Sequence, residues 1–272
     1  MRKSGIGIAN SSRDNMYFIG QRHIMNQMMD ILPHLYENDV GMNLLMRGPS
    51  GWGKTRMSFM ICNYLTGGKF EYCLGDKPTF NDSIRVHFID EVHLLEKPET
   101  LYPKMDSGKY IIVLATNDVA TLSEALVNRC SEFIFDKYSI PELREISRCC
   151  LKVNLPDSFL DYIIESGGSN PRIVKEIISR LNIVLFRHPD IVRNMNLVGF
   201  KELLEVTFGI KDGMDIMCIR VIDALKALGG TASIQTLATY VHIDHNTLRY
   251  YVEPILLYKN IIKITSKGRS LI

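Results

Sequence analysis

The sequence has no run of apolar residues approaching the roughly 18 that a membrane-spanning helix needs. Residues 1–15 contain no apolar core long enough for a secretion signal. The six cysteines form no CxxC pair and show no His/Cys ligand spacing, so we expect free thiols in a reducing cytosol. The formal net charge is only +2, which means that any basic surface must be local. These absences predict a cytoplasmic protein without a membrane segment.

Internal repeats and low-complexity segments are also missing. What remains is a chain of 272 residues, long enough for two or three small domains, with 46% hydrophobic and 23% charged residues. Such proportions are ordinary for a soluble globular protein, so function has to be sought in local motifs.

A phosphate-binding loop occupies residues 48–55, which read GPSGWGKT and complete the pattern G-x-x-x-x-G-K-[ST]. An apolar run at 42–46 precedes it and a helix is predicted over 56–65, so the motif has the strand–loop–helix context that it requires. Its glycines let successive backbone N–H groups turn toward an anion. We expect Lys54 to contact the β- and γ-phosphates of ATP and Thr55 to bind Mg²⁺. The expected nucleotide contacts in the loop are Gly48, Pro49, Ser50, Gly51, Trp52, Gly53, Lys54 and Thr55.

Two carboxylates end a second apolar run, VHFIDEVH at residues 86–93. The run predicts a strand that places Asp90 and Glu91 at the carboxyl edge of a sheet, where open α/β sheets bind their ligands. We expect Asp90 to hold Mg²⁺ through water and Glu91 to orient or deprotonate the attacking water. The alternative is a solvated strand end that carries two surface acids.

A third apolar run, YIIVLATN at residues 110–117, ends in a polar side chain. It predicts a strand that places Asn117 between the strand of the P-loop and the acidic strand. There the amide could contact the γ-phosphate or the attacking water. A simple turn-forming asparagine is the alternative.

Two arginines follow in the chain. Residues 122–130 predict a helix that ends near Arg129, just before a strand at 132–135. A later helix opens at GGSNPR, with Asn170 as its cap and Pro171 in its first turn, directly before Arg172. A surface salt bridge would explain either arginine alone.

The order of these features resembles that of AAA+ ATPases: P-loop, Asp-Glu strand, polar strand end, Asn-Arg-Cys and Gly-Ser-Asn-Pro-Arg. The resemblance implies an α/β fold, with a parallel sheet flanked by helices followed by an all-α lid. It also implies that Arg129 is the finger that reaches the nucleotide of the neighbouring subunit, and that Arg172 is the lid sensor for the γ-phosphate in its own subunit. A finger in trans requires an oligomer, so we expect a ring, usually a hexamer.

Further segments narrow the resemblance to the Holliday-junction branch-migration motors of the RuvB family, from about Tyr17 to Arg269. In that family the segment like YFIGQ wraps the adenine, which implies nucleotide contacts for Phe18 and Ile19. The segments are YFIGQ at 17–21, FIDEVH at 88–93, LYPKM at 101–105, NPR at 170–172, YVEPILL at 251–257 and TSKGRS at 265–270.

The chain departs from the RuvB pattern in three places. Residues 106–109 stand where the bacterial motor has a long β-hairpin that docks on its junction-recognition partner. The segment 67–84 is compressed, and position 117 carries Asn where the motor tends to carry Thr. These differences leave ATP hydrolysis in place and make the protein partner an unidentified one.

We expect three domains: an AAA+ nucleotide-binding core at 1–138, a helical lid at 139–212 and a winged-helix DNA-binding domain at 213–272. The lid should contain helices near 142–152, 157–165, 170–186 and 198–208. The winged helix should contain helices at 217–228 and 233–240, a further helix capped by Asp244, and a two-stranded wing at 261–265 and 269–272.

The expected wing is basic, because Lys259, Lys263, Lys267 and Arg269 occur there without an acid. We predict that Lys267 and Arg269 contact the DNA backbone, without sequence preference. Base reading by His245, Asn246 and Arg249 on the preceding helix is one alternative. A protein-docking or structural domain is another.

These predictions leave three functions open, each with ATP and Mg²⁺ as cofactors. The first is an ATP-driven DNA motor, a ring that translocates duplex or branched DNA. The second is a loader or scaffold that assembles on DNA or a partner protein and is released by hydrolysis. The missing hairpin favours the second slightly and the tail motifs favour the first. The third is a switch ATPase whose winged helix recruits proteins and never meets DNA.

Overall fold

The computed structural model describes residues 17–188 and 190–272, so residues 1–15, considered above for a secretion signal, lie outside it. The chain forms two compact units. The first contains residues 17–49 and 53–136, and the second contains 50–52 and 137–272. The expected division at 138 and 212 into core, lid and winged helix remains a prediction. In the described part of the chain, no helix is long and apolar enough to cross a membrane.

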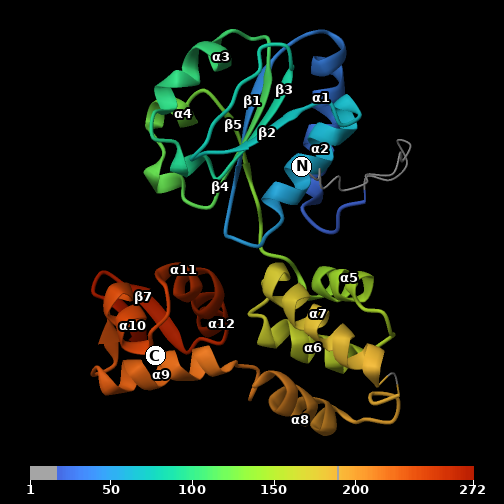
Figure 1. Ribbon diagram of the computed structural model, residues 1–272, viewed down its shortest axis with the longest axis vertical. Helices are drawn as coiled ribbons and strands as arrows, with labels where there is room; N and C mark the ends of the chain where they lie inside the picture. The colour runs from blue at the N-terminus through green and yellow to red at the C-terminus, as the bar shows by residue number, and fades with distance from the viewer. Residues whose placement is uncertain (1–16, 189) are drawn as a thin grey trace, which may run out of the picture. The chain divides into compact units, whose positions relative to one another are not determined.

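The first unit is built on a parallel five-stranded sheet with strand order β2-β3-β4-β1-β5. Every residue of β3 and β4 is buried, as expected for strands covered on both faces. Figure 1 shows α1 and α2 on one side of the strands and α3 and α4 on the other. The strands are β1 (Met42–Arg47), β2 (Glu71–Leu74), β3 (Val86–Asp90), β4 (Ile111–Thr116) and β5 (Ser131–Ile134).

The helices of the first unit include the predicted P-loop helix, α2. The predicted helix at 122–130 is shorter, and its start is set at Glu124 by the Ser123 side chain, which accepts from Leu126 N. Short 3₁₀ turns form at Val92–Leu94, Pro98–Thr100 and Val119–Thr121. The helices are α1 (Arg22–Glu37), α2 (Lys54–Thr66), α3 (Tyr102–Asp106) and α4 (Glu124–Val127). The α/β fold class is confirmed.

The strand order brings the candidate site to one edge of the sheet. β4 pairs with β3 on one side and with β1 on the other, so the end of β4 lies between the P-loop strand and the acidic strand. This confirms the predicted place of Asn117. Only residues 107–110 connect α3 to β4. Gly41 N donates to Gly108 O at 2.7 Å across this connection, which leaves no hairpin there.

The second unit begins with the four predicted helices, α5 (Ile140–Cys150), α6 (Asp157–Ser166), α7 (Pro171–Arg187) and α8 (Leu197–Phe208). The Ser139 hydroxyl and the Glu142 carboxylate form a capping box at the start of α5. The Asn170 side chain caps α7 as predicted, by accepting from Arg172 N. The buried stripe of α7 follows helical spacing: Pro171, Ile173, Val174, Ile177, Ile178, Leu181 and Leu185.

The winged-helix segment contains α9 (Ile216–Ala227), β6 (Thr231–Ala232), α10 (Ile234–Val241), α11 (His245–Thr247), α12 (Glu253–Tyr258), β7 (Ile262–Thr265) and β8 (Gly268–Leu271). The two predicted strands of the wing form the antiparallel pair β7-β8, and β6 adds an unpredicted third strand beside β8. β6 has only two residues, too few to show the alternation of apolar and polar residues that predicts a strand. The predicted helix after Asp244 is interrupted by a π-helical turn, Leu248–Val252, because Pro254 has no N–H to donate to the preceding turn.

Within the second unit, the lid helices and the winged helix pack closely against each other. Lys259 Nζ lies 2.5 Å from Glu165 Oε1, and Gly213 N donates to the Tyr162 hydroxyl at 3.1 Å. A Cβ on Gly168 would lie 2.7 Å from Ile255 Cα, so only glycine fits there. The two parts therefore share one packed unit.

Candidate active site

The phosphate-binding loop holds its lysine by its own carbonyl groups. Gly51 and Gly53 have φ values of 85° and 95°, in the left-handed region that favours glycine. Lys54 is the first residue of α2, and its Nζ donates to Gly48 O at 2.7 Å and to Pro49 O at 2.9 Å. Burial lowers the pKa of Lys54 to about 8, although the nearby Glu91 and Asp90 charges oppose the shift. A phosphate group could replace these carbonyls as the partner of the ammonium group.

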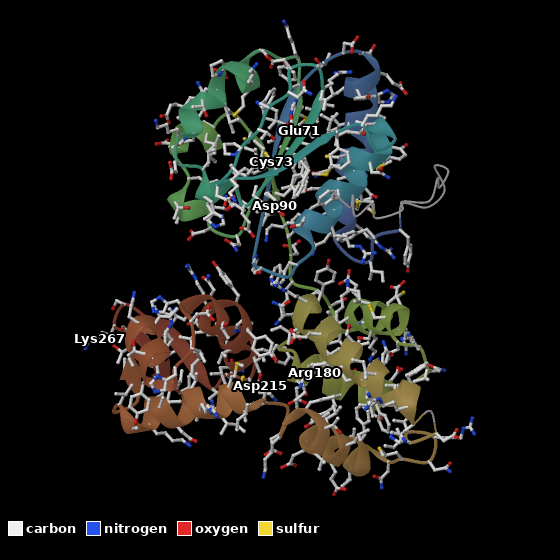
Figure 2. All side chains as sticks on the ribbon, in the orientation of Figure 1. Glu71, Cys73, Asp90, Arg180, Asp215 and Lys267 are labelled. Atoms are coloured by element: carbon white, nitrogen blue, oxygen red, sulfur yellow. The ribbon has the colours of Figure 1, made fainter. Side chains whose placement is uncertain are left out.

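A hydroxyl and a carboxylate converge beside this lysine. Thr55 Oγ1 donates to Asp90 Oδ2 at 2.8 Å, and Asp90 Oδ1 accepts from Glu91 N at 3.0 Å. Figure 2 shows Asp90 where β3 ends, at the lower edge of the sheet. In the described residues there is no cluster of three or more His, Cys, Asp or Glu able to hold a metal ion. One hydroxyl and one carboxylate suit Mg²⁺, which takes its other ligands from nucleotide phosphates and water.

Two oxygen atoms at this edge are buried without a hydrogen-bond partner in the described part of the chain: Glu91 Oε2 and Asn117 Oδ1. Buried polar atoms are almost always bonded, so such atoms mark a place where a ligand or water is expected. Glu91 also has φ 51° and ψ 45°, which is strained for a residue with a side chain. Together with Lys54, Thr55 and Asp90, these atoms fit the binding of ATP and Mg²⁺.

The loop tip, residues 50–52, contacts the start of the lid within the second unit. Asn170 Nδ2 donates to Ser50 O at 3.0 Å, and the Tyr138 hydroxyl donates to Trp52 O at 3.1 Å. A Cβ on Gly51 would lie 2.2 Å from Asn170 Oδ1, so a side chain would break this contact. Arg172, which follows on α7, is exposed. Its sensor role remains a prediction.

Gln21 is a structural feature of the site that the sequence did not reveal. Gln21 Nε2 donates to Asp136 O at 2.7 Å, and Asp136 N donates to Gln21 Oε1 at 2.9 Å. This pair fastens the YFIGQ segment to the chain just after β5. Phe18 and Ile19 are half-buried in that segment, and their contact with adenine stays a prediction. Gln21 stands inside the quoted motif, but its partner lies 115 residues away.

Arg129 is held by residues next to the shortened connection. Its Nε and Nη2 donate to the two carboxylate oxygens of Asp106 at 2.9 and 3.2 Å, and its Nη1 donates to Ala125 O at 2.8 Å. The guanidinium also lies 4.4 Å from the centre of the Tyr102 ring. These bonds use three of its five N–H groups and leave two for another partner. The finger role remains a prediction.

Arg269 is bonded within its own domain, and its predicted contact with DNA stays a prediction. Arg269 Nε donates to Glu253 Oε1 at 2.6 Å, and the two side chains are only 15% and 5% exposed. Its charge is therefore neutralised inside the domain. Lys259 is similarly paired with Glu165. Lys267 is exposed, and Figure 2 shows it at the periphery of its domain, so it stays a predicted DNA contact.

Comparison with known proteins finds similarity to RuvB in the C-terminal segment and along most of the chain. Residues 211–272 match the family described as the RuvB C-terminal winged helix domain. The Holliday junction branch migration complex subunit RuvB of Pseudothermotoga lettingae is 26% identical over 294 residues, which cover 93% of this chain and 84% of the relative. The protein of the same name from Mycoplasma genitalium is 25% identical over 290 residues, which cover 93% and 92%.

A solved structure shows that the likeness extends to the fold. The Thermotoga maritima RuvB Holliday junction branch migration motor superposes with a TM-score of 0.79 at 24% identity, covering 94% of this chain and 93% of that one. The similarity thus covers both the core that carries the P-loop and the C-terminal segment that carries the tail motifs. The chain resembles RuvB along 93% of its length and combines a P-loop core on a parallel sheet with a segment that matches the RuvB C-terminal winged helix domain.

Proposed function

We propose that this protein is an oligomeric DNA motor that hydrolyses ATP and acts on duplex or branched DNA, as its relatives named Holliday junction branch migration subunits do. The single observation that carries the ATPase part is the convergence of Lys54, the Thr55–Asp90 pair and the orphaned Glu91 oxygen at one sheet edge. The similarity to RuvB over 93% of the chain supplies the DNA part.

The residues of the site divide the work of phosphoryl transfer among them. Bound ATP supplies the γ-phosphoryl group, and Mg²⁺ neutralises its charge. Lys54 exchanges the loop carbonyls for phosphate oxygens, while Thr55 would ligate the ion and Asp90 would hold it through water. Glu91 orients the attacking water and accepts its proton, while Asn117 fixes the γ-phosphate or that water.

The remaining parts of the proposal concern the assembly. We infer a ring, of six subunits as the AAA+ resemblance implies, in which the two N–H groups of Arg129 that Asp106 and Ala125 leave unused reach the neighbouring nucleotide. Arg172 acts as the sensor within its own subunit. The lid at 139–212 and the winged helix at 213–272 follow the core at 1–138, and Lys267 contacts the DNA backbone. An unidentified protein partner replaces the one that uses the hairpin.

The experiment that tests this function measures ATP turnover by the purified protein alone, with linear duplex and with a four-way junction, together with migration of the junction. We expect DNA-stimulated turnover and junction migration. Lys54→Ala should abolish nucleotide binding, whereas Glu91→Gln should keep ATP binding and lose turnover by at least about 100-fold. Turnover unchanged in either variant would reject the assignment of the site.

One observation favours the loader alternative. Only residues 107–110 lie between α3 and β4, at the place where the motor carries its partner-docking hairpin. A loader would show DNA-stimulated hydrolysis and release from DNA upon turnover, with no migration of the junction. The same assay therefore separates the two functions.

A further inference from the structure

One histidine lies between two functional strands. His93 is in the 3₁₀ turn Val92–Leu94 that follows the acidic strand. Its Nδ1 atom is 3.1 Å from Thr116 Oγ1 and 3.3 Å from Glu91 Oε2. The ring is mostly shielded, with its side chain 16% exposed. A single ring nitrogen therefore faces two oxygen atoms, one on each side of the candidate site.

Thr116 is fixed from the other side. It is the last residue of β4 and is fully buried. Its Oγ1 accepts from Asp118 N at 3.0 Å, and this bond closes the turn that carries Asn117 between them. The position of the Thr116 hydroxyl is thus tied to the position of the Asn117 amide.

Glu91 has little freedom in its backbone. Gly75 N donates to Asp90 O at 2.8 Å, and a Cβ on Gly75 would lie 2.4 Å from Glu91 O. The strained left-handed conformation of Glu91 is therefore packed in place by the neighbouring loop. Only the side-chain torsions remain to direct the carboxylate. His93 Nδ1 lies 3.3 Å from its buried Oε2, close enough to bond to it after a small rotation of either side chain.

We propose that His93 is a positioning residue, whose Nδ1 atom is hydrogen-bonded to Thr116 Oγ1 in this structure and whose Nδ1 proton turns to the Glu91 carboxylate during ATP hydrolysis. The inference rests on the proposed role of Glu91 in ATP hydrolysis. Nδ1 has one proton and two acceptors within reach, Thr116 Oγ1 and Glu91 Oε2. If the Asn117 turn shifts and moves Thr116, the Nδ1 proton is bonded less to Thr116 and more to Glu91. His93 thereby links the γ-phosphate contact to the residue that handles water.

The test compares three side chains at position 93. His93→Ala removes the donor, whereas His93→Asn places an amide N–H group near the position of Nδ1. We expect His93→Ala to lower kcat about tenfold, as loss of an orienting partner typically does, with the Kd for ATP changed less than about twofold. His93→Asn should recover most of the loss. Equal turnover of His93→Ala and wild type would overturn the proposal, and so would an Asn variant as impaired as the Ala variant.

A second pair of variants, at Thr116, keeps the proposal testable if a variant at position 93 fails to fold. Thr116→Ser keeps the hydroxyl and should retain turnover, whereas Thr116→Val keeps the shape, removes the hydroxyl and should lower kcat with unchanged ATP affinity. Equal behaviour of the two would contradict the orienting role.

A readout independent of activity is the ring proton itself. The ¹⁵N spectrum of the histidine rings in the nucleotide-free protein should show His93, identified by its absence in His93→Asn, protonated at Nδ1. A ring protonated only at Nε2 would overturn the proposal. Failure of the proposed function looks different, because wild type would then show no ATP turnover while the spectrum still reports the Nδ1 proton. Wild type and Glu91→Gln are therefore measured alongside.

Discussion

The edge of the parallel sheet and the wing of the second unit both carry charged residues predicted to bind a ligand, but they treat these charges differently. At the sheet edge, Lys54 is bonded only to loop carbonyls, and Glu91 Oε2 has no hydrogen-bond partner in the described residues. In the wing, Arg269 is bonded to the buried carboxylate of Glu253. A charge with replaceable partners is available to a ligand, whereas a charge paired inside the domain stabilises the fold.

The largest effect should come from Arg129, which is paired with Asp106 but keeps two N–H groups for another partner. Arg129→Ala should lower ATP turnover by about 10³-fold, the lower range for loss of an arginine finger, with nucleotide binding by each subunit unchanged. Mixing this variant with Glu91→Gln should restore part of the activity, because some interfaces then join an intact Glu91 to an intact Arg129. Mixtures that stay inactive at every ratio would show that Arg129 does not act on a neighbour.

A stability measurement should distinguish Arg269 from a ligand-binding residue. Arg269→Ala should reduce the free energy of unfolding by about 3 kcal/mol, because Glu253 is left buried and unpaired. The double variant Arg269→Met, Glu253→Leu should recover most of this loss, since it removes both charges. Urea unfolding measures both effects. If Arg269→Ala kept full stability and only weakened DNA binding, the result would support the predicted DNA contact of Arg269 instead.

The lysine of the sheet edge should make nucleotide affinity depend on pH. The pKa of Lys54 in the free protein is lowered to about 8, and phosphates favour its charged form. ATP binding therefore takes up a proton above pH 8, so affinity should be level below that pH and fall by at most about tenfold per pH unit above it. Titration with labelled ATP from pH 7 to pH 9.5 measures this. Lys54→Arg, whose guanidinium stays charged, is the control and should lack the slope.

The smallest effect belongs to the exposed wing lysine. Lys267→Ala should leave stability within about 0.5 kcal/mol of wild type. It should also reduce the dependence of log Kobs for duplex DNA on log salt concentration by about 0.9, one phosphate contact. Lys69→Ala, at a lysine of the first unit that is also exposed, is the matched control. A slope identical to that of the control would remove the wing from the DNA interface.

Much of the fold was predictable because its signals are local. The buried strands β3 and β4 are continuous apolar runs, and the caps Ser139, Asn170 and Asp244 stand directly before their helices. The strand order was predicted only for β3, β4 and β1, because the P-loop motif and the polar strand ends implied it there. The short β6 was missed, because two residues are too few to show an alternation of apolar and polar side chains.

The amino-acid sequence by itself determined the phosphate-binding loop and the polar strand ends, since contiguous residues form each of them. Only the tertiary structure decided which partner each charged or polar side chain has. Asp106 meets Arg129, Glu253 meets Arg269, and Thr116 lies opposite His93, each across 16 residues or more. Such pairs depend on which segments the fold brings within hydrogen-bonding distance, and that distance is not encoded in the spacing along the chain.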